Sequence, residues 1–443
     1  KVMNKAFDWQ RQPLGEKVVE EALDATFKNP DIQSFSDRLG GISTRLFDWV
    51  DTVQVGQEFE QKVQEAGFTL FHATPTSKIY RHFGAQFPLI EVNDDSEQGI
   101  AVQVDSVADF LSANGINGLI EGTPYSPLRR CLISKKENVS FWVVERRSLS
   151  SVEPTYYEED YLEDYFEAVD KWSSRPRRIN EGILIAQEIA ENMVERLGEA
   201  IAASIVCEIE RKYWQNKNHA GQIQKSRQDR LGLGWANHDH HTFRSSRKHF
   251  KDLVRLFEIL GFRCRERFYA GEEAGWGAQV MEHPKVRLVL FLDVDLGADE
   301  IVIDFAHKEL PERHELGTIG LWCALHGDSI LESGMHHLEA QFEFDLLKED
   351  LKGYDVDIMN PFSDYSYLKQ AFTKGEQWPV DPARLDRLFK EGKINASEKD
   401  KFTKEGAVGS HMENLQRREG YKGFNQKNVS FIIKETDPRL IAK

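Results

Sequence analysis

Hydrophobic residues in the first part of the chain recur at the spacing of a helix. Val18, Val19 and Ala22 would share one helical face, and the same spacing returns at Val50 and Val53. This pattern predicts that residues 1–66 form a helical cap.

The pattern changes to short apolar runs separated by turn residues after residue 66. These runs predict strands, with one helix between them, and we treat residues 67–150 as one module, module A. The expected strands are 68–71, 100–104, 118–120, 132–133 and 141–144, and the expected helix is 106–114.

Residues 151–235 are expected to connect two modules. An acidic, tyrosine-rich linker around residues 156–166 precedes a single long helix over 179–214, in which Ile183, Ala186 and Met193 lie on one apolar face. We expect this helix to pack one module against the other.

A second module, module B, is expected at residues 236–345. The pattern predicts a strand, a helix and three strands in that order, and then further elements. The further elements are a strand at 301–305, an apolar helix at 318–331 and a strand at 335–344, and residues 346–408 are expected to be polar and mostly helical. The fold class expected for the whole chain is α+β.

Residues 409–412, Gly-Ser-His-Met, resemble the remnant of a cleaved purification tag. The sequence from Asp437 to Lys443 begins a helix that residues 1–7 would continue. We therefore hypothesise that the native order runs from 412 to 443 and then from residue 1, which requires Lys443 and Lys1 to lie close together. Whichever order is native, His411 is set aside as part of the tag remnant.

Composition restricts the classes of partner. The formal charge of −16, with 57 basic against 73 acidic residues, argues against a nucleic-acid partner. Four widely spaced cysteines favour reduced thiols, and no apolar run approaches the roughly 20 residues that a membrane span needs. We expect a cytoplasmic protein without a membrane partner.

Histidines are concentrated in one part of the chain, with eleven of the 14 between His219 and His337. On a strand over 238–244, alternation would place His238, His240 and Arg244 on one face. Two imidazoles beside a guanidinium suit a metal centre next to a group that binds a carboxylate. The alternative is that these histidines are hydrogen-bonded and have no function.

A second histidine-containing strand is expected at 335–344. Alternation would place His337 and Glu339 on one face, from which they could join His240 in the two-histidine, one-carboxylate set typical of non-haem Fe(II) oxygenases. A strand with one hydrated face is the alternative interpretation. Glu282 is the reserve carboxylate.

Motifs of several other enzyme classes are absent from the sequence. It contains no glycine-rich dinucleotide fingerprint, no phosphate-binding Gly-Lys-Ser/Thr loop, no Gly-x-Ser-x-Gly elbow and no His-Glu-x-x-His.

The order of elements in module B, with His240 and Arg244 on its first strand and Leu-Phe-Glu-Ile-Leu-Gly-Phe at 256–262, resembles the vicinal oxygen chelate superfamily. Within that superfamily the chain is similar to the 2-oxoadipate dioxygenase/decarboxylase family. The resemblance implies βαβββ modules, iron bound by His240, and a 2-oxo acid carboxylate held by Arg244.

Module A contains fragments that resemble the same family, at residues 119–124 and around His72. Relative to that family, the two modules would then occur in reversed order along the chain. The strand 100–104 carries no candidate ligand. Two choices remain open for the other metal ligands, either His337 with Glu339 or His72 with Glu145. Strand geometry favours the first.

The leading functional hypothesis is a mononuclear non-haem Fe(II) enzyme of the dioxygenase/decarboxylase type that uses O2 and acts on a small 2-oxo acid or other carboxylate. An alternative is a lyase, isomerase or hydrolase that holds Zn or Mn on the same scaffold. A second alternative is a non-catalytic protein that binds a small molecule.

Overall fold

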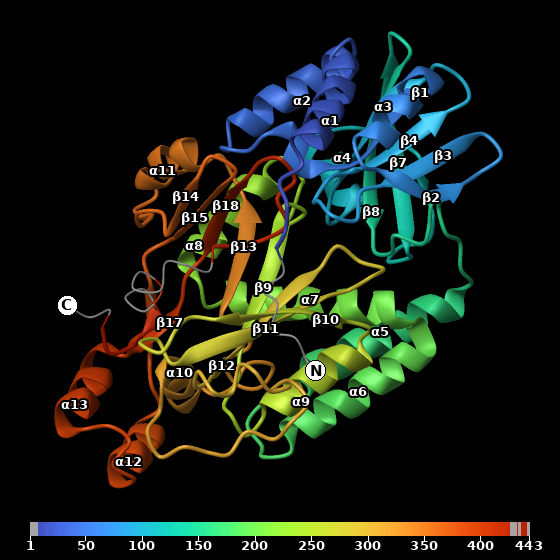
Figure 1. The fold of residues 1–443 in the computed structure, drawn as a ribbon. Coiled ribbons are helices and arrows are strands. Elements are labelled where there is room, and N and C mark those ends of the chain that lie inside the picture. The colour runs from blue at the N-terminus through green and yellow to red at the C-terminus, as the bar shows by residue number, and fades with distance from the viewer. Residues whose placement is uncertain (1–7, 426–431, 433–435, 441–443) are drawn as a thin grey trace.

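Two eight-stranded sheets dominate the computed structural model, which describes residues 8–425, 432 and 436–440 (Figure 1). Each sheet consists of two βαβββ modules that pair through an antiparallel contact between their first strands, β1 with β5 and β9 with β13. The prediction of an α+β fold built from βαβββ modules is confirmed.

The first sheet has the strand order β2-β3-β4-β1-β5-β8-β7-β6. Its first module comprises β1 (Val50–Gly56), α3 (Glu60–Glu65), β2 (Thr69–Ala73), β3 (Ser77–Arg81) and β4 (Leu89–Asn93). Its second comprises β5 (Gln98–Gln103), α4 (Val107–Asn114), β6 (Ile120–Glu121), β7 (Leu128–Lys136) and β8 (Val139–Arg146). Helices α1 (Pro13–Thr26) and α2 (Pro30–Gly40) and the short helices η1 (Leu46–Trp49) and η2 (Gln57–Phe59) complete this lobe.

The second sheet has the order β10-β11-β12-β9-β13-β18-β15-β14. Its first module comprises β9 (His238–Arg244), α9 (Phe250–Ile259), β10 (Arg263–Tyr269), β11 (Trp276–Glu282) and β12 (Val289–Asp295). Its second comprises β13 (His337–Gln341), α11 (Phe344–Lys352), β14 (Ser363–Tyr365), β15 (Leu368–Phe372) and β18 (Glu413–Arg417). Helix α10 (Thr318–His326) connects the two modules, and β16 (Glu376–Trp378), α12 (Pro382–Lys390), α13 (Ala396–Glu405) and β17 (Ala407–Ser410) are inserted between β15 and β18.

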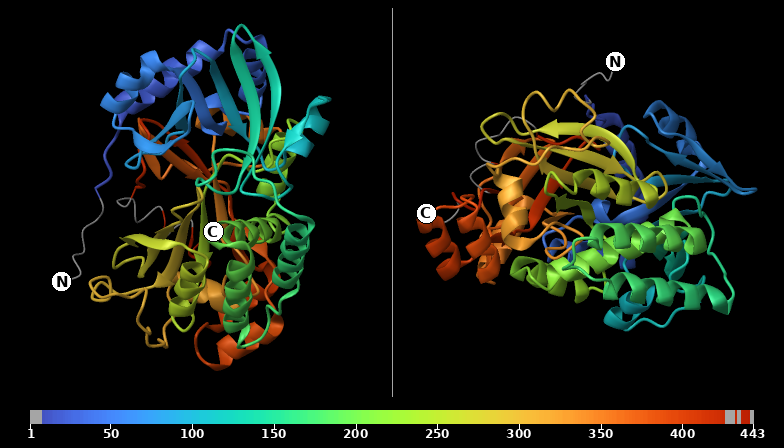
Figure 2. Two further views of the ribbon diagram at one scale, coloured as in Figure 1. Left: turned by 90° about the vertical axis from the view of Figure 1, so that its right-hand side faces the viewer. Right: turned by 90° about the horizontal axis from the view of Figure 1, so that it is seen from below.

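Four helices connect the lobes: α5 (Glu159–Ser174), α6 (Gly182–Leu197), α7 (Glu199–Gln215) and α8 (His219–Asp229). Helices α5, α6, α7 and α9 pack together on one flank of the second lobe (Figures 1 and 2). No helix in the described part of the chain is both long and apolar enough to cross a membrane.

Alternation along the strands gives the second sheet two different faces. On β12, Leu290, Leu292 and Val294 belong to the core that includes the helices, whereas Phe291 contacts His240, with the ring centroids 4.4 Å apart. The candidate chemistry therefore lies on the face of the sheet opposite the helices.

Several predicted elements are wrong in detail. Residues 50–56 are a strand within the expected helical cap, because Val53 and Val55 alternate toward the core rather than following a helical face. The expected long helix is two helices, because Gly198 adopts φ of 81° between them. The expected strand at 301–305 is absent, and Val302 is 56% exposed there.

Residues 346–408 are not mainly helical, since β14, β15, β16 and β17 lie within or next to them. These strands have three to five residues each, which is too short for a clear alternating pattern. The chain therefore contains four βαβββ modules where the sequence suggested two.

The segment that resembles a tag remnant is part of the core. Ser410 and His411 are almost completely buried, and Ser410 Oγ accepts hydrogen bonds from Trp214 Nε1 at 2.6 Å and Asn218 Nδ2 at 3.1 Å. Setting His411 aside was therefore wrong, because this segment leads directly into the central strand β18. Lys1 and Lys443, whose proximity would test the permuted order, lie outside the described residues.

Substitution of Gly409 by alanine is expected to destabilise the fold. A Cβ atom at this position would lie 1.9 Å from Cδ2 of Trp378, whose indole is held by a hydrogen bond to the Lys217 carbonyl. We expect a loss of about 1–3 kcal/mol in the free energy of unfolding, which is typical of overpacking. Denaturant titration would measure it.

Gly40 provides the control, since a Cβ added there meets nothing within 4 Å at the end of α2. Gly40→Ala should leave stability unchanged or slightly raised. Equal stability of Gly409→Ala and wild type would contradict the packing described around Trp378.

Candidate metal centre

Three neighbouring strands bring polar residues into one row across the second sheet. In the register of β9, β13 and β18, Glu339 lies opposite His240 on one side and opposite Glu413 on the other. The parallel pairing of β13 with β18 thus places Glu413 beside residues more than 70 positions earlier in the chain.

The donor atoms of three of these side chains converge. His337 Nε2 lies 2.9 Å from Glu413 Oε2, and His240 Nε2 lies 3.6 Å from the same oxygen. All three residues are buried, and one ligand atom from each lies within 4.8 Å of the others. Two imidazole nitrogens and one carboxylate oxygen fit the donor set of a mononuclear Fe(II) centre, and they also suit Zn or Mn.

Glu413 was not among the residues selected from the sequence. It directly follows residues 409–412, which were interpreted as a tag remnant, and no strand was predicted there. A usable signal was present, because His411 and Glu413 have the same two-residue spacing on an extended segment as His337 and Glu339.

Glu339 lies on the other side of the His240 ring. Its Oε1 is 2.8 Å from His240 Nδ1, whereas Glu413 faces Nε2. Gln370 Nε2 donates to both carboxylates, at 2.9 Å to Glu339 Oε2 and 3.0 Å to Glu413 Oε1. One possible ligand atom each from Glu339, His240 and Asp239 lies within 4.8 Å of the others. Glu339 and His337 do not belong to a common group of this kind among the described residues.

Burial and neighbouring charges set the protonation of this row. Burial, followed by the negative charge of Glu413, raises the pKa of Glu339 well above its usual value. Although burial opposes protonation of His240, the Glu339 carboxylate raises the pKa of His240 well above its usual value. The contact between Glu339 Oε1 and His240 Nδ1 lies on the side of the ring away from Glu413.

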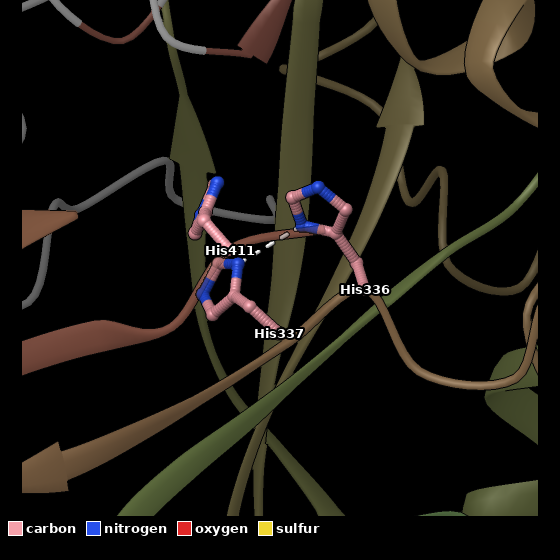
Figure 3. A group of neighbouring side chains, drawn as sticks. All are labelled: His336, His337 and His411. Carbon is pink, nitrogen blue, oxygen red and sulfur yellow. Dashed lines mark hydrogen bonds between the residues drawn. The ribbon is translucent and has the colours of Figure 1, made fainter. Parts of the chain in front are cut away.

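Two more histidines surround His337, as Figure 3 shows. His336 Nδ1 lies 2.9 Å from His337 Nδ1, and the His411 ring stacks on the His337 ring at a centroid distance of 4.8 Å. Burial lowers the pKa of all three imidazoles well below the usual value, so they are neutral, which is the form that binds metals. One nitrogen from each also lies within 4.8 Å of the others.

The two nitrogens of His337 face different groups. Its Nε2 faces Glu413, so its Nδ1 is free to donate a hydrogen bond to His336. Metal-binding histidines commonly donate through the second ring nitrogen, which fixes the tautomer. His336 therefore suits a supporting position better than a ligand position.

Arg244 is a buried cation with incomplete pairing. Its side chain is 1% exposed, its Nε lies 3.9 Å from Asp293 Oδ2, and neither Nε nor Nη1 has a hydrogen-bond partner among the described residues. Burial lowers the pKa of Arg244 to about 10, which leaves it charged at neutral pH, and burial raises the pKa of Asp293 to about 7. The unused donors of Arg244 can bind an anion.

His238 does not share the face of His240. The pairing of β9 with β13 shifts register at Asp239, so two residues of β9 oppose one of β13. The His238 ring instead packs against His241 at 5.2 Å, and burial lowers the pKa of His238 to about 3. The expected alternation was wrong at this bulge.

The other reserve residues lie elsewhere. Glu282 pairs with Lys422 at 2.8 Å, and His72 is exposed on β2. Glu145 is on β8, and β3, β4, β1 and β5 separate it from the strand of His72. The structure does not bring His72 and Glu145 together.

Comparison with known proteins gives no family assignment. No family model matches the chain, and no curated protein matches it. Among solved structures, a variant of 4-hydroxymandelate synthase from Streptomyces coelicolor is 11% identical, with 89% of this chain and 98% of that chain covered and a TM-score of 0.25.

Two further structures match parts of the chain. Methylmalonyl-CoA epimerase from Mycobacterium tuberculosis is 10% identical over 41% of this chain and 89% of that chain, with a TM-score of 0.23. A protein described as a hydrolase from Shewanella frigidimarina is 13% identical over 54% of this chain and 92% of that chain, with a TM-score of 0.29. None of these likenesses assigns an activity to the chain.

Proposed function

We propose that the chain is a mononuclear non-haem Fe(II) enzyme that uses O2 and acts on a small 2-oxo acid or other carboxylate. The observation that carries the proposal is the convergence of His240 Nε2, His337 Nε2 and Glu413 Oε2 in a buried site. Glu413 replaces Glu339 as the proposed carboxylate ligand.

Some residues of the chain would bind the metal or the substrate, and others would orient the metal ligands. Bound Fe(II) would supply open coordination positions for O2 and a substrate oxygen, and it would activate O2 by donating electrons to it while the substrate is oxidised. Arg244 would hold the substrate carboxylate through charge-assisted hydrogen bonds from its unused donors. Glu339 would orient His240, and His336 would accept the Nδ1 proton of His337.

Elemental analysis of protein purified without chelating resin tests the proposal. Wild type should contain about one equivalent of iron, as expected for a single site with three protein ligands. Glu282→Gln is the control for loss of a carboxylate outside the site, because Glu282 pairs with Lys422 there. This variant should retain the metal. Zinc or manganese without oxygen uptake would favour a redox-silent lyase, isomerase or hydrolase, and no metal after anaerobic reconstitution would favour a binding protein.

The role given to Glu339 predicts an intermediate effect of its substitution. Glu339→Gln should weaken metal affinity about 10–100-fold without abolishing it, which is the usual cost of losing an outer partner of a ligand. Competition with a chelator would measure this affinity. Complete loss of metal would instead identify Glu339 as a ligand.

A further inference from the structure

A cavity lined by charged side chains lies where the first lobe meets α7. Its volume is about 190 Å³, and its walls come from the end of β8, from α7, from the start of β9 and from residues 285–288. None of His240, His337, Glu413 or Arg244 lines it, so it is separate from the candidate metal centre.

The cavity is more cationic than the protein as a whole. Seven arginine or lysine side chains and five carboxylates line it among the described residues, although the chain has a formal charge of −16. A local excess of positive charge in an acidic protein favours the binding of an anion.

Carboxylates that line the cavity already have hydrogen-bond or ion-pair partners. Asp51 pairs with both Arg146, at 2.8 Å, and Arg287, at 3.4 Å. Asp105 accepts a hydrogen bond from the backbone N–H of Trp235 at 2.7 Å. Two of the lining cations pair with carboxylates outside the cavity, Arg417 with Asp239 at 3.2 Å and Lys285 with Glu199 at 3.4 Å, so weakly paired positive charge remains at Arg147 and Arg211.

Among the cations that line the cavity, Arg147 and Arg211 lie farthest from any carboxylate in the described chain. The Arg147 side chain is 10% exposed, its nearest carboxylate is Glu145 at 3.8 Å, and Glu145 also lies 3.5 Å from Arg129. Arg147 Nη1 is buried without a hydrogen-bond partner among the described residues, and the side chain of Arg211 contacts a histidine rather than a carboxylate there. Its guanidinium lies 3.5 Å from His241 Nε2. Burial of a guanidinium group without a close anionic partner lowers the stability of the fold, and a bound anion would reduce that cost.

We propose that this cavity binds a small dianion, a dicarboxylate or inorganic phosphate, between Arg147 of the first lobe and Arg211 of α7. The planar fork of arginine suits both kinds of oxygen. The volume accommodates either ion, since one water molecule occupies about 30 Å³ of liquid. The site is independent of the proposed iron chemistry, because it shares neither the three ligands nor Arg244.

Isothermal titration of the full-length chain with malonate and, separately, with inorganic phosphate tests the proposal. The Arg244→Met variant isolates the cavity from the proposed substrate site, and it should bind about one of these anions per chain. Arg147→Met and Arg211→Met should each weaken that binding at least about 10-fold, which is the cost of one charge-assisted hydrogen bond. The anion that binds more tightly identifies the ligand class.

Arg255→Met is the control, because Arg255 is 62% exposed and lies outside the cavity. It should bind as wild type does, and Arg147→Lys, which keeps the charge, should lose less affinity than Arg147→Met. Absence of saturable binding in both wild type and Arg244→Met would overturn the proposal whether or not the cavity variants fold. Undiminished binding in Arg147→Met and Arg211→Met would overturn it as well.

Discussion

Replacement of Glu413 by glutamine should abolish metal binding and turnover without harming the fold. The variant removes the only carboxylate oxygen that faces both His240 Nε2 and His337 Nε2 in the described site. Metal affinity should fall more than about 100-fold, because loss of an outer partner alone costs about 10–100-fold. Elemental analysis and chelator competition would measure the loss.

The metal-free variant should be at least as stable as metal-free wild type. Glu413 and Glu339 are buried close together and both accept a hydrogen bond from Gln370, so removing one negative charge relieves repulsion. Thermal unfolding in the presence of chelator checks this expectation. Full metal content in Glu413→Gln would contradict the proposed ligand set and would indicate that His336, His337 and His411 bind the metal instead.

Replacement of Arg244 by methionine should separate substrate binding from metal binding. The variant should keep the metal, because Arg244 supplies no ligand atom, but should bind a carboxylate substrate at least about 30-fold more weakly. The fold should tolerate the change, since methionine fills similar space and two donors of Arg244 have no partner among the described residues. Substrate titration of the metal-loaded variant, followed by steady-state kinetics, would give both effects.

Arg244→Lys refines this prediction. Lysine keeps the charge but lacks the planar fork, so its affinity should lie between those of wild type and Arg244→Met. Substrate affinity unchanged in Arg244→Met would exclude Arg244 from carboxylate binding and leave its partial contact with Asp293 as its only role.

Alternation along predicted strands was sufficient to find two of the three proposed ligands. His240 and His337 lie on the buried inner face of β9 and β13 as expected. Alternation specifies the face of a strand, but it does not specify which ring nitrogen a neighbour approaches. Glu339 therefore looked like a ligand, although it faces Nδ1 of His240.

Long-range pairing was beyond what local patterns could predict. Glu413 reaches the site only because β18 pairs in parallel with β13 after an insertion that includes α12 and α13. The bulge at Asp239 is also invisible in the sequence, since it arises from the register between two strands. The four-module architecture was hidden because β14 and β15 are too short to show a clear period and because β1 lies in the segment predicted to be helical.

The position of β18 has a consequence for the order in which the site can assemble during synthesis. A nascent chain that ends before Glu413 contains both histidines but lacks the carboxylate, and β13 and β15 expose the edges that β18 later covers. Exposed strand edges recruit other chains and promote aggregation. The metal would thus meet the complete set of three ligands only after Glu413 had emerged from the ribosome, long after the two histidines.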